Sequence, residues 1–420
     1  MTLLITGGTV LTKDRWIESD LLIEGNVVSS VGTRLKSDQV IDAAGCLVGP
    51  GFVDLHTHLR EPGQTWKEDI ASGSRAAAAG GFTAIVAMPN TDPPMDQVKV
   101  VEAVLSAGRE AEIVDLFASG ALTRGRSGVE PVEVRALYEA GVRLFTDDGD
   151  SVLDAKVLKD LMISIAGLGD AFVAQHAEDH PRTAGGHMHE GEVSRRHGVS
   201  GLSSGAESDI VARDLELVAE TGVRYHCQHV SAAQTVELIR QAKRRGLPVT
   251  AEVTPHHIWF DESALAELDS NFKMYPPLRT SSDRAALVAA LRDGTIDIVA
   301  TDHAPHTPEE KGVSFADAPR GVIGLETAAG AIWPTLDDPD RFFTVMSSAP
   351  ARLIGADDHG FPISPGSPAN LVIFDPEHHW SPDSFRSRSS NSPFLGSQLQ
   401  GKVRATVRQG NVVYEEGELN

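Results

Sequence analysis

The sequence contains few cysteines and no long apolar run, and both absences narrow the class of protein. Only Cys46 and Cys227 are present, so a disulfide framework is not expected. No apolar run reaches the roughly 20 residues that a membrane-spanning helix needs. The N-terminal stretch MTLLITGGTVLTKDRW lacks the basic region and the long apolar segment of a signal peptide. We therefore expect a cytoplasmic protein without a membrane partner.

Basic residues are scarce relative to acidic ones. The chain has 37 Lys and Arg against 59 Asp and Glu, a formal net charge of −22. Such a surface repels phosphate backbones and anionic lipids, which argues against nucleic acid as the main partner. Because salt screens charges over roughly 8–10 Å, a local arginine can still attract a small anion. The charge balance therefore favours a small-molecule substrate.

The 420 residues are enough for one large domain and a small one, and the pattern changes along the chain. Both ends are typical of short strands separated by turns, with Gly410-Asn411 as a hairpin turn. These terminal strands are expected at 3–5, 21–24, 27–31, 40–42, 370–374 and 403–414. Eight apolar strand candidates lie between them, at 52–56, 82–88, 113–118, 142–146, 171–176, 223–229, 248–253 and 296–301. Helical patterns separate most of the eight, for example at 70–79, 98–111, 211–220 and 232–245.

Eight strand-then-helix units predict an α/β fold, a (β/α)₈ TIM-type barrel over residues 51–354. Residues 1–50 and 355–420 would join into a small β-rich domain, with 381–397 as an irregular loop. A doubly wound open sheet is the alternative, and the count of eight favours the barrel. The active site of a barrel lies at the C-terminal ends of its strands.

Side chains that bind metals follow five of the predicted strands. His56 and His58 close the first, Asp147 and Asp148 follow the fourth, His176 ends the fifth, His229 the sixth and Asp302 the eighth. Each alone has an ordinary explanation: a strand-end histidine is often structural, Asp-Asp-Gly is usually a turn, and an aspartate can cap a helix. Together at one end of a barrel, these imidazoles and carboxylates predict a zinc site.

The number of candidate ligands favours two zinc ions. His56 and His58 would hold one ion, His176 and His229 the other, and Asp147 or Asp148 would bridge them. Zinc lowers the pKa of bound water to around 7, which provides a nucleophile at neutral pH. Asp302 would take the proton of this water and pass it to a leaving nitrogen. The alternative is that Asp302 is a ligand only and another group moves the proton.

Other residues near these strand ends suit substrate binding. Arg60 can grip a carboxylate with two parallel hydrogen bonds, although a surface salt bridge is the alternative. Asn90 could donate to the same carboxylate or simply form a turn, and His306 could bind substrate or tune Asp302. Gly321 allows close backbone approach. His256 and His257 are expected to be structural, and 307–319 is expected to be a loop whose closure over substrate is left open.

Eight stretches together carry a family resemblance. They are DLHTHLREPG (54–63), MPNTDPP (88–94), FTDDG (145–149), AQHAED (174–179), QHVSAA (228–233), AEVTPHH (251–257), PPLR (276–279) and ATDHAPH (300–306). In this order they resemble the dihydroorotases of the amidohydrolase superfamily, in the type with an Asp in place of the carboxylated Lys. The resemblance implies a barrel with a β-sandwich from both termini, and reversible hydrolysis of L-dihydroorotate to N-carbamoyl-L-aspartate in pyrimidine synthesis.

The resemblance also assigns residues. It implies zinc on His56, His58, Asp148, His176, His229 and Asp302, acid–base catalysis by Asp302, and substrate binding by Arg60, Asn90, Tyr275, His306, Arg320 and Gly321. Two positions depart from the family pattern. Tyr275 stands where an Asn that contacts substrate is common, and Arg320 replaces an often apolar residue, so that only its backbone role is expected to carry over.

Two alternative functions remain at this stage. An allantoinase or hydantoinase shares the paired histidines, but its carboxylated Lys is missing from Phe145–Gly149, and Arg60 suits a substrate with a free carboxylate. A catalytically silent scaffold would be expected to lose some ligands, whereas every ligand position is filled here. A homodimer and an association with aspartate carbamoyltransferase are left open.

Overall fold

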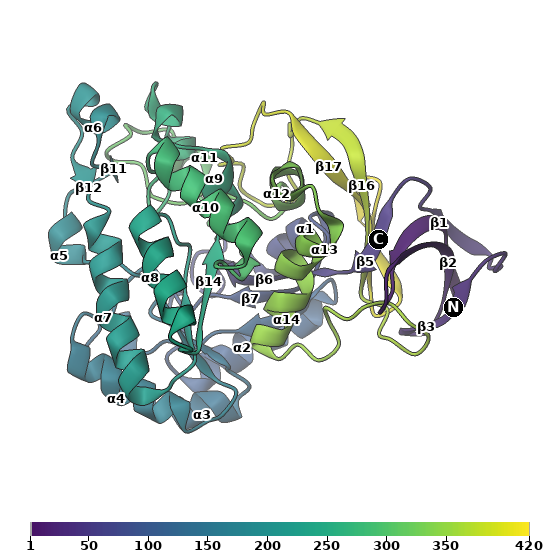
Figure 1. Ribbon diagram of the computed structural model, residues 1–420, viewed down its shortest axis with the longest axis horizontal. Helices are drawn as coiled ribbons and strands as arrows, with labels where there is room; N and C mark the ends of the chain where they lie inside the picture. Colours follow the sequence, from purple (N-terminus) through teal and green to yellow (C-terminus); the bar gives the residue numbers. More distant parts are fainter. Residues whose placement is uncertain (1, 420) are drawn as a thin grey trace.

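The computed structural model describes residues 2–419 and has an α/β architecture. Figure 1 shows a large part in which helices surround strands, and a β-rich end that contains both termini. All eight strands predicted for the middle of the chain are present, several of them shorter than predicted. They are β6 (Phe52–Thr57), β7 (Phe82–Ala87), β8 (Asp115–Ala118), β9 (Leu144–Phe145), β10 (Phe172–Gln175), β13 (Tyr225–Cys227), β14 (Val249–Val253) and β15 (Ile298–Val299).

These eight strands pair in parallel in the order of the chain. One sheet holds β6, β7 and β8, and another holds β9, β10, β13, β14 and β15. A parallel bridge between Gly120 and Phe145 connects β8 to β9, and a second between Thr57 and His303 connects the segment after β15 back to β6. One buried apolar cluster combines side chains of β6, β7, β9, β10 and β15. Pairing that returns to its first strand favours a closed barrel over an open sheet.

Helices lie between these strands. Helices α1 (Ile70–Ala79) and α2 (Val98–Ala111) have the predicted bounds, α8 (Ala233–Arg244) is one residue shorter at each end, and α7 (Gly205–Thr221) begins six residues earlier than predicted. Asp69 caps α1 in a reciprocal pair with Ser72. The other helices are α3 (Val134–Glu139), α4 (Ala155–Ala166), α5 (His180–Thr183), α6 (Glu192–His197), α9 (Pro255–Trp259), α10 (Ser281–Asp293), α11 (Pro308–Lys311), α12 (Ala328–Leu336), α13 (Pro339–Phe343) and α14 (Ala349–Ile354).

The two chain ends form one nine-stranded sheet, with the order β19-β18-β17-β16-β5-β1-β2-β3 and β4 beside β1. Its strands are β1 (Thr2–Leu11), β2 (Trp16–Glu24), β3 (Val27–Gly32), β4 (Gln39–Asp42), β5 (Leu47–Pro50), β16 (Leu371–Trp380), β17 (Leu399–Arg408), β18 (Asn411–Glu415) and β19 (Glu418–Leu419). Antiparallel pairing of β16 with β5 connects the two ends, and side chains from both ends share one buried cluster. A short pair, β11 (Met188–His189) and β12 (Gly201–Leu202), lies apart.

The predicted hairpin turn at Gly410-Asn411 is wrong by one residue. The turn consists of Gln409 and Gly410, with φ of 49° and 79°, and Asn411 begins β18. Two successive left-handed residues suit the tight turn of a two-residue hairpin.

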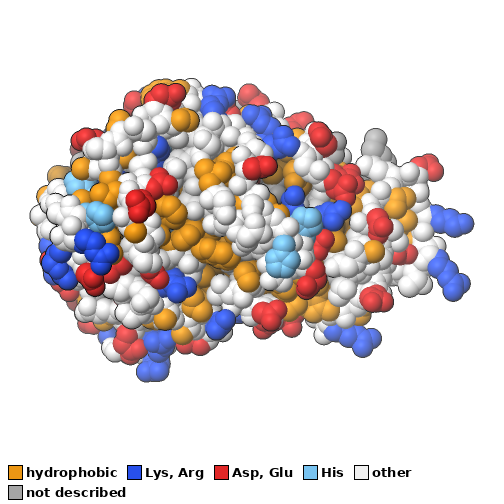
Figure 2. Space-filling view, turned by 90° about the horizontal axis from the view of Figure 1, so that it is seen from above, with side chains coloured by type: hydrophobic (Ala, Val, Ile, Leu, Met, Phe, Trp, Pro, Cys, Tyr) orange, Lys and Arg blue, Asp and Glu red, His pale blue; other side chains and the backbone are white. Residues whose placement is uncertain are grey.

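On the face shown in Figure 2, basic and acidic side chains are interspersed. None of the helices within residues 2–419 combines the length and the apolar composition needed to cross a bilayer.

Candidate metal centre

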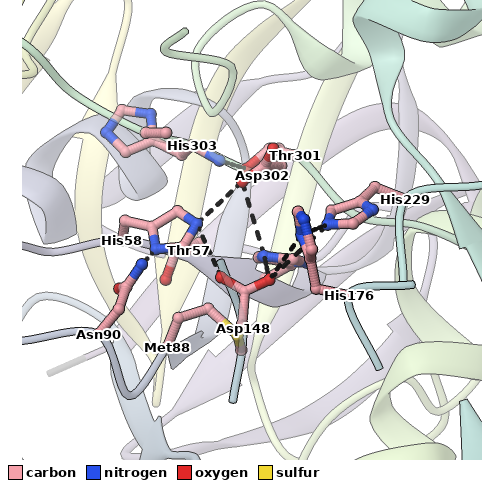
Figure 3. Close-up of polar contacts among 12 residues, drawn as sticks. Thr57, His58, Met88, Asn90, Asp148, His176, His229, Thr301, Asp302 and His303 are labelled. Atoms are coloured by element: carbon pink, nitrogen blue, oxygen red, sulfur yellow. Dashed lines mark hydrogen bonds and ion pairs between the residues drawn. The ribbon is translucent and has the colours of Figure 1, made fainter. Parts of the chain in front are cut away.

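All the predicted ligands converge at the C-terminal ends of the parallel strands. His56 lies in β6 and His58 follows it, while Asp148 follows β9. Figure 3 shows Asp148 between His58 on one side and His176 and His229 on the other, with Asp302 facing them. Every one of these side chains is at least nine-tenths buried. The convergence that the strand-end pattern predicted is therefore present.

His56, His58 and Asp148 form the first potential metal cluster. Asp148 places Oδ1 3.2 Å from Nε2 of His56 and Oδ2 3.4 Å from Nε2 of His58. Asp302 joins this cluster, because its Oδ1 lies 2.9 Å from Nε2 of His58 and 3.6 Å from Nε2 of His56. Two imidazoles and two carboxylates thus face one small volume.

Asp148, His176 and His229 form the second cluster. Oδ1 of Asp148 lies 3.7 Å from both Nδ1 of His176 and Nε2 of His229, and these two nitrogens are 2.8 Å apart. Burial and the neighbouring His229 lower the pKa of His176 well below its usual range, which keeps the ring neutral as a metal ligand requires. Asp148 is the residue that belongs to both clusters.

Nothing else in residues 2–419 satisfies two central atoms of this site. Nε2 of His56 and Oδ1 of Asp148 are both buried without a hydrogen-bond partner, although buried polar atoms are nearly always paired. A cation placed between them would satisfy both atoms. The nitrogen and oxygen donor set is the one that zinc prefers, so the residues fit the predicted metal.

The geometry also distinguishes the two adjacent aspartates. Asp147 points away from the histidines and accepts hydrogen bonds from the backbone of Leu122 and Thr123 and from the hydroxyl of Thr123. Asp148 faces the histidines instead. Burial raises the pKa of Asp148, but the facing histidines, above all His56, outweigh burial and hold it well below the usual range.

A buried carboxylate supports His56 from behind. Glu252 in β14 places Oε1 2.6 Å from Nδ1 of His56 and Oε2 3.0 Å from Nε2 of His226. Burial opposes ionisation, yet His56 and His226 lower the pKa of Glu252 well below its usual range. A carboxylate in this position fixes the ring and leaves Nε2 as the metal-facing atom. The sequence reasoning missed Glu252, although it lies within the AEVTPHH stretch.

Asp302 is held in an uncommon backbone conformation. Asp54 accepts hydrogen bonds from the backbone nitrogen and the hydroxyl of Thr301, the preceding residue, and from the backbone nitrogen of His56. Asp302 has φ of 47°, and His229 and Arg60 also have positive φ, at 30° and 60°. Such conformations are costly for residues with side chains and often mark functional sites. Asp54 thus connects the first strand to the placement of Asp302.

A cavity of about 380 Å³ opens onto these clusters. Every predicted metal ligand except His56 lines it. So do all six predicted substrate-binding residues, which are Arg60, Asn90, Tyr275, His306, Arg320 and Gly321. Arg60 places its guanidinium 3.4 Å from Nε2 of His306, and His306 donates from Nε2 to the carbonyl of Arg320 at 2.8 Å. Burial and the nearby Arg60 lower the pKa of His306 to about 2. Arg60 also donates from Nε to the carbonyl of Pro305 at 3.2 Å. Beside the neutral histidine, its guanidinium is a positive group that can attract an anionic ligand.

Two of the lining residues have further partners. Asn90 accepts from Nδ1 of His58 at 2.8 Å through its carbonyl oxygen, which leaves the amide nitrogen for a ligand. Arg320 stacks its guanidinium 4.1 Å above the ring of Tyr275 and donates to the carbonyl of Gly186 at 2.5 Å. The two positions expected to depart from the family pattern, Tyr275 and Arg320, therefore pack against each other.

The paired histidines 256 and 257 lie beside the site rather than in it. His257 lies 2.7 Å from the hydroxyl of Thr254 and donates to the carbonyl of Pro276 at 3.0 Å, consistent with the structural role expected for it. Asn391, from the irregular 381–397 stretch, was not predicted. Its amide nitrogen donates to the carbonyls of Ala304 and Gly321, and its oxygen accepts from the backbone of His306.

Comparison with known proteins identifies clear relatives. A family model described as dihydro-orotase-like matches residues 45–235. The dihydroorotase of Mycobacterium leprae (strain TN) is 44% identical over 405 residues, which cover 94% of each chain. The dihydroorotase of Pelotomaculum thermopropionicum is 42% identical over 427 residues, which cover 99% of each chain.

Solved structures give the same architecture under different names. L-hydantoinase (dihydropyrimidinase) from Arthrobacter aurescens has a TM-score of 0.89 and 26% identity, over 100% of this chain and 97% of that one. Dihydropyrimidinase from Brevibacillus agri NCHU1002 has a TM-score of 0.84 and 24% identity, over 100% and 96%, and shows likeness of fold alone.

Proposed function

The chain belongs to the dihydroorotase family, and we infer that it hydrolyses L-dihydroorotate reversibly to N-carbamoyl-L-aspartate, a step of pyrimidine biosynthesis. Identity above 40% over nearly the full length of both chains supports this function. The observation that carries the chemistry is the pair of ligand clusters that share Asp148 at the base of a cavity lined by Arg60.

We propose zinc as the metal, with two ions. His56, His58 and Asp302 would hold one ion, His176 and His229 the other, and Asp148 both. When bound, zinc supplies an activated water and polarises the scissile carbonyl. The carboxylate of Asp302 faces the space between His56 and His58. From there it can take the proton of the attacking water and pass it to the ring nitrogen that leaves.

We propose that the substrate carboxylate binds to Arg60 and to the amide nitrogen of Asn90. A guanidinium offers two parallel donors that match a carboxylate. The neutral His306 would form a hydrogen bond with the substrate ring. The backbone around Gly321 would contact the ureide edge of the substrate. Tyr275 and Arg320 would form the opposite wall, where the guanidinium of Arg320 stacks on the ring of Tyr275.

The finer architecture is part of the same proposal. The closed strand order supports a (β/α)₈ barrel over residues 51–354, and the shared terminal sheet supports a β-sandwich from residues 1–50 and 355–420. A cytoplasmic location, a homodimer and an association with aspartate carbamoyltransferase stay predictions.

The structural likeness to hydantoinases does not outweigh the dihydroorotase assignment. Identity to the hydantoinase is 26%, against 44% to a dihydroorotase. The segment Phe145–Gly149 contains no lysine, and Asp148 occupies the position between the histidines. Hydantoin and allantoin also lack the carboxylate for which Arg60 is suited.

A substrate panel tests the assignment. Zinc-loaded protein is incubated separately with L-dihydroorotate, hydantoin and allantoin, and loss of the intact ring is followed by absorbance or chromatography. We expect turnover of dihydroorotate alone, and loss of turnover when a chelator removes the metal. Turnover of hydantoin or allantoin without turnover of dihydroorotate would refute the assignment.

A further inference from the structure

Two buried lysines lie outside the metal centre, beside the loop that forms one wall of the cavity. Lys273 follows the short 3₁₀ turn Ser270–Phe272, and Lys311 is the last residue of α11 (Figure 1). They are 3% and 6% exposed, which is rare for lysine unless its charge is satisfied. Neither residue has a role in the reaction described above.

The ammonium group of Lys311 is surrounded by backbone carbonyls. It donates to the oxygens of Ser270, Lys273 and Pro319 at 2.8, 3.2 and 3.0 Å. An ammonium has three protons, and each has an acceptor here. Pro319 is thereby connected to the 270–273 turn.

Lys273 makes the same type of contact with the middle of the loop. Its ammonium group donates to the carbonyls of Phe315, Ala316 and Ala318 at 2.6, 2.9 and 2.6 Å. The two lysines therefore donate six hydrogen bonds to backbone carbonyls, four of which hold the loop residues 315, 316, 318 and 319. No helix or strand orders these residues.

The two charges are balanced by carbonyl dipoles rather than by ion pairs. No carboxylate oxygen within residues 2–419 lies within 4.0 Å of either nitrogen. Burial lowers the pKa of Lys273 to about 8, with Arg320 adding to the effect, and lowers that of Lys311 to about 7, with Lys273 adding. Asp317 and Asp269 act in the opposite direction, and Nδ1 of His187 lies 3.4 Å from Lys273.

The loop held by these lysines leads directly into the cavity. The backbone nitrogen of Gly321 donates to the carbonyl of Lys273 at 2.9 Å, and the carbonyl of Arg320 accepts from His306. Gly321 has φ of 129°, and a Cβ there would lie 2.8 Å from the side chain of Ala304. A shift of the loop would therefore displace two cavity-lining residues together.

We propose that Lys273 and Lys311 are positioning residues that hold residues 312–321 as a fixed wall of the substrate pocket. The proposal rests on the function inferred above. The two lysines would therefore affect the affinity for substrate and not the rate of the chemical step. The proposal also extends to loop closure: the segment 307–319 would not act as a lid but would hold Arg320 and Gly321, which line the cavity, in place.

Lys273→Met and Lys311→Met test the proposal, because methionine keeps the length of the stem and removes the donors. Lys156→Met is the matched control, since this lysine is on the surface of α4 with its side chain 84% exposed. We expect KM for dihydroorotate to rise about tenfold in each buried variant, with kcat within about twofold and zinc content unchanged. An unchanged KM, or equal losses of kcat and zinc content, would overturn the proposal.

A second measurement keeps the test independent of activity and of how well the variants fold. Limited subtilisin digestion of the wild-type protein is compared at pH 6.5 and pH 9, with cleavage mapped by mass spectrometry. At the higher pH a lysine that has lost a proton can donate to only two of its three carbonyl acceptors, so the loop is held less firmly. We therefore expect faster cleavage within 312–321 at pH 9, relative to cleavage elsewhere in the same protein. Equal relative cleavage at both pH values would contradict the proposal. If the wild-type protein does not hydrolyse dihydroorotate, the proposed function is refuted. The digestion would still test whether the two lysines hold the loop.

Discussion

Glu252 and His56 form a buried pair in which the carboxylate oxygen Oε1 lies 2.6 Å from Nδ1 of the imidazole. The two residues are 196 positions apart in the sequence and come from β14 and β6. Because Nδ1 faces Glu252, Nε2 is the ring atom that faces Asp148. Glu252 therefore determines how His56 is presented to a metal.

Replacement of Glu252 by Gln tests this support. The amide can still accept from His56 but no longer carries the charge that makes the imidazole a stronger ligand. We expect zinc affinity to fall about 10- to 100-fold, measured by competition with a chromogenic chelator. Glu237→Gln, on the outer surface of α8, serves as the control. Wild-type affinity in Glu252→Gln would show that the pair does not support the metal.

Arg60→Lys tests carboxylate recognition. Lysine keeps the positive charge but loses the two parallel donors of the guanidinium. Burial lowers the pKa of Arg60 to about 10, so the native side chain is still charged at neutral pH. We expect KM for dihydroorotate to rise about 30- to 100-fold, corresponding to roughly 2–3 kcal/mol. Arg135→Lys, on α3, should leave KM unchanged. Wild-type KM in Arg60→Lys would exclude this arginine from substrate binding.

His257 provides a test of stability against pH. Burial, with a contribution from His229, lowers its pKa from 6.5 to about 4. The folded state therefore resists protonation more than the unfolded state does. This contribution is complete above pH 6.5 and is lost as pH falls towards 4, and it amounts to at most about 3 kcal/mol.

The measurement compares wild type with His257→Gln, which keeps an amide donor for Pro276 but does not titrate. Urea unfolding of the metal-free proteins at pH 7 and pH 4.5 gives the free energies. We expect wild type to lose more free energy of unfolding than the variant between the two pH values. Equal losses would mean that His257 does not contribute to acid sensitivity.

Much of the fold follows from local patterns, and the strand ends illustrate why. His56 and His58 are two apart, so an extended chain places them on one side. The choice between Asp147 and Asp148 could not be made in this way, because adjacent residues after a strand exchange sides with small changes in the turn. The structure distinguishes them by the hydrogen bonds of Asp147 to the 122–123 segment.

Residues that act through distant partners left no local signal. Glu252 lies in a buried strand. In the sequence it is a single charged residue between apolar neighbours, and only the fold shows that His56 lies beside it. Asn391 and the two buried lysines lie in or beside irregular segments without periodicity, and their partners are mostly backbone carbonyls, with the backbone nitrogen of His306 as a further partner of Asn391. Backbone acceptors are the same at every residue, so no sequence pattern marks them.

The most direct test of the account compares dihydroorotate hydrolysis by zinc-loaded wild-type protein and by Asp302→Asn, with the metal content of both measured. The variant retains an oxygen that can face the metal but cannot accept and return a proton. We predict that wild type hydrolyses dihydroorotate and that kcat of the variant is about 10²- to 10⁴-fold lower at comparable zinc content. Wild-type kcat in Asp302→Asn would contradict the proposed role of Asp302, and absence of hydrolysis by zinc-loaded wild type would contradict the account as a whole.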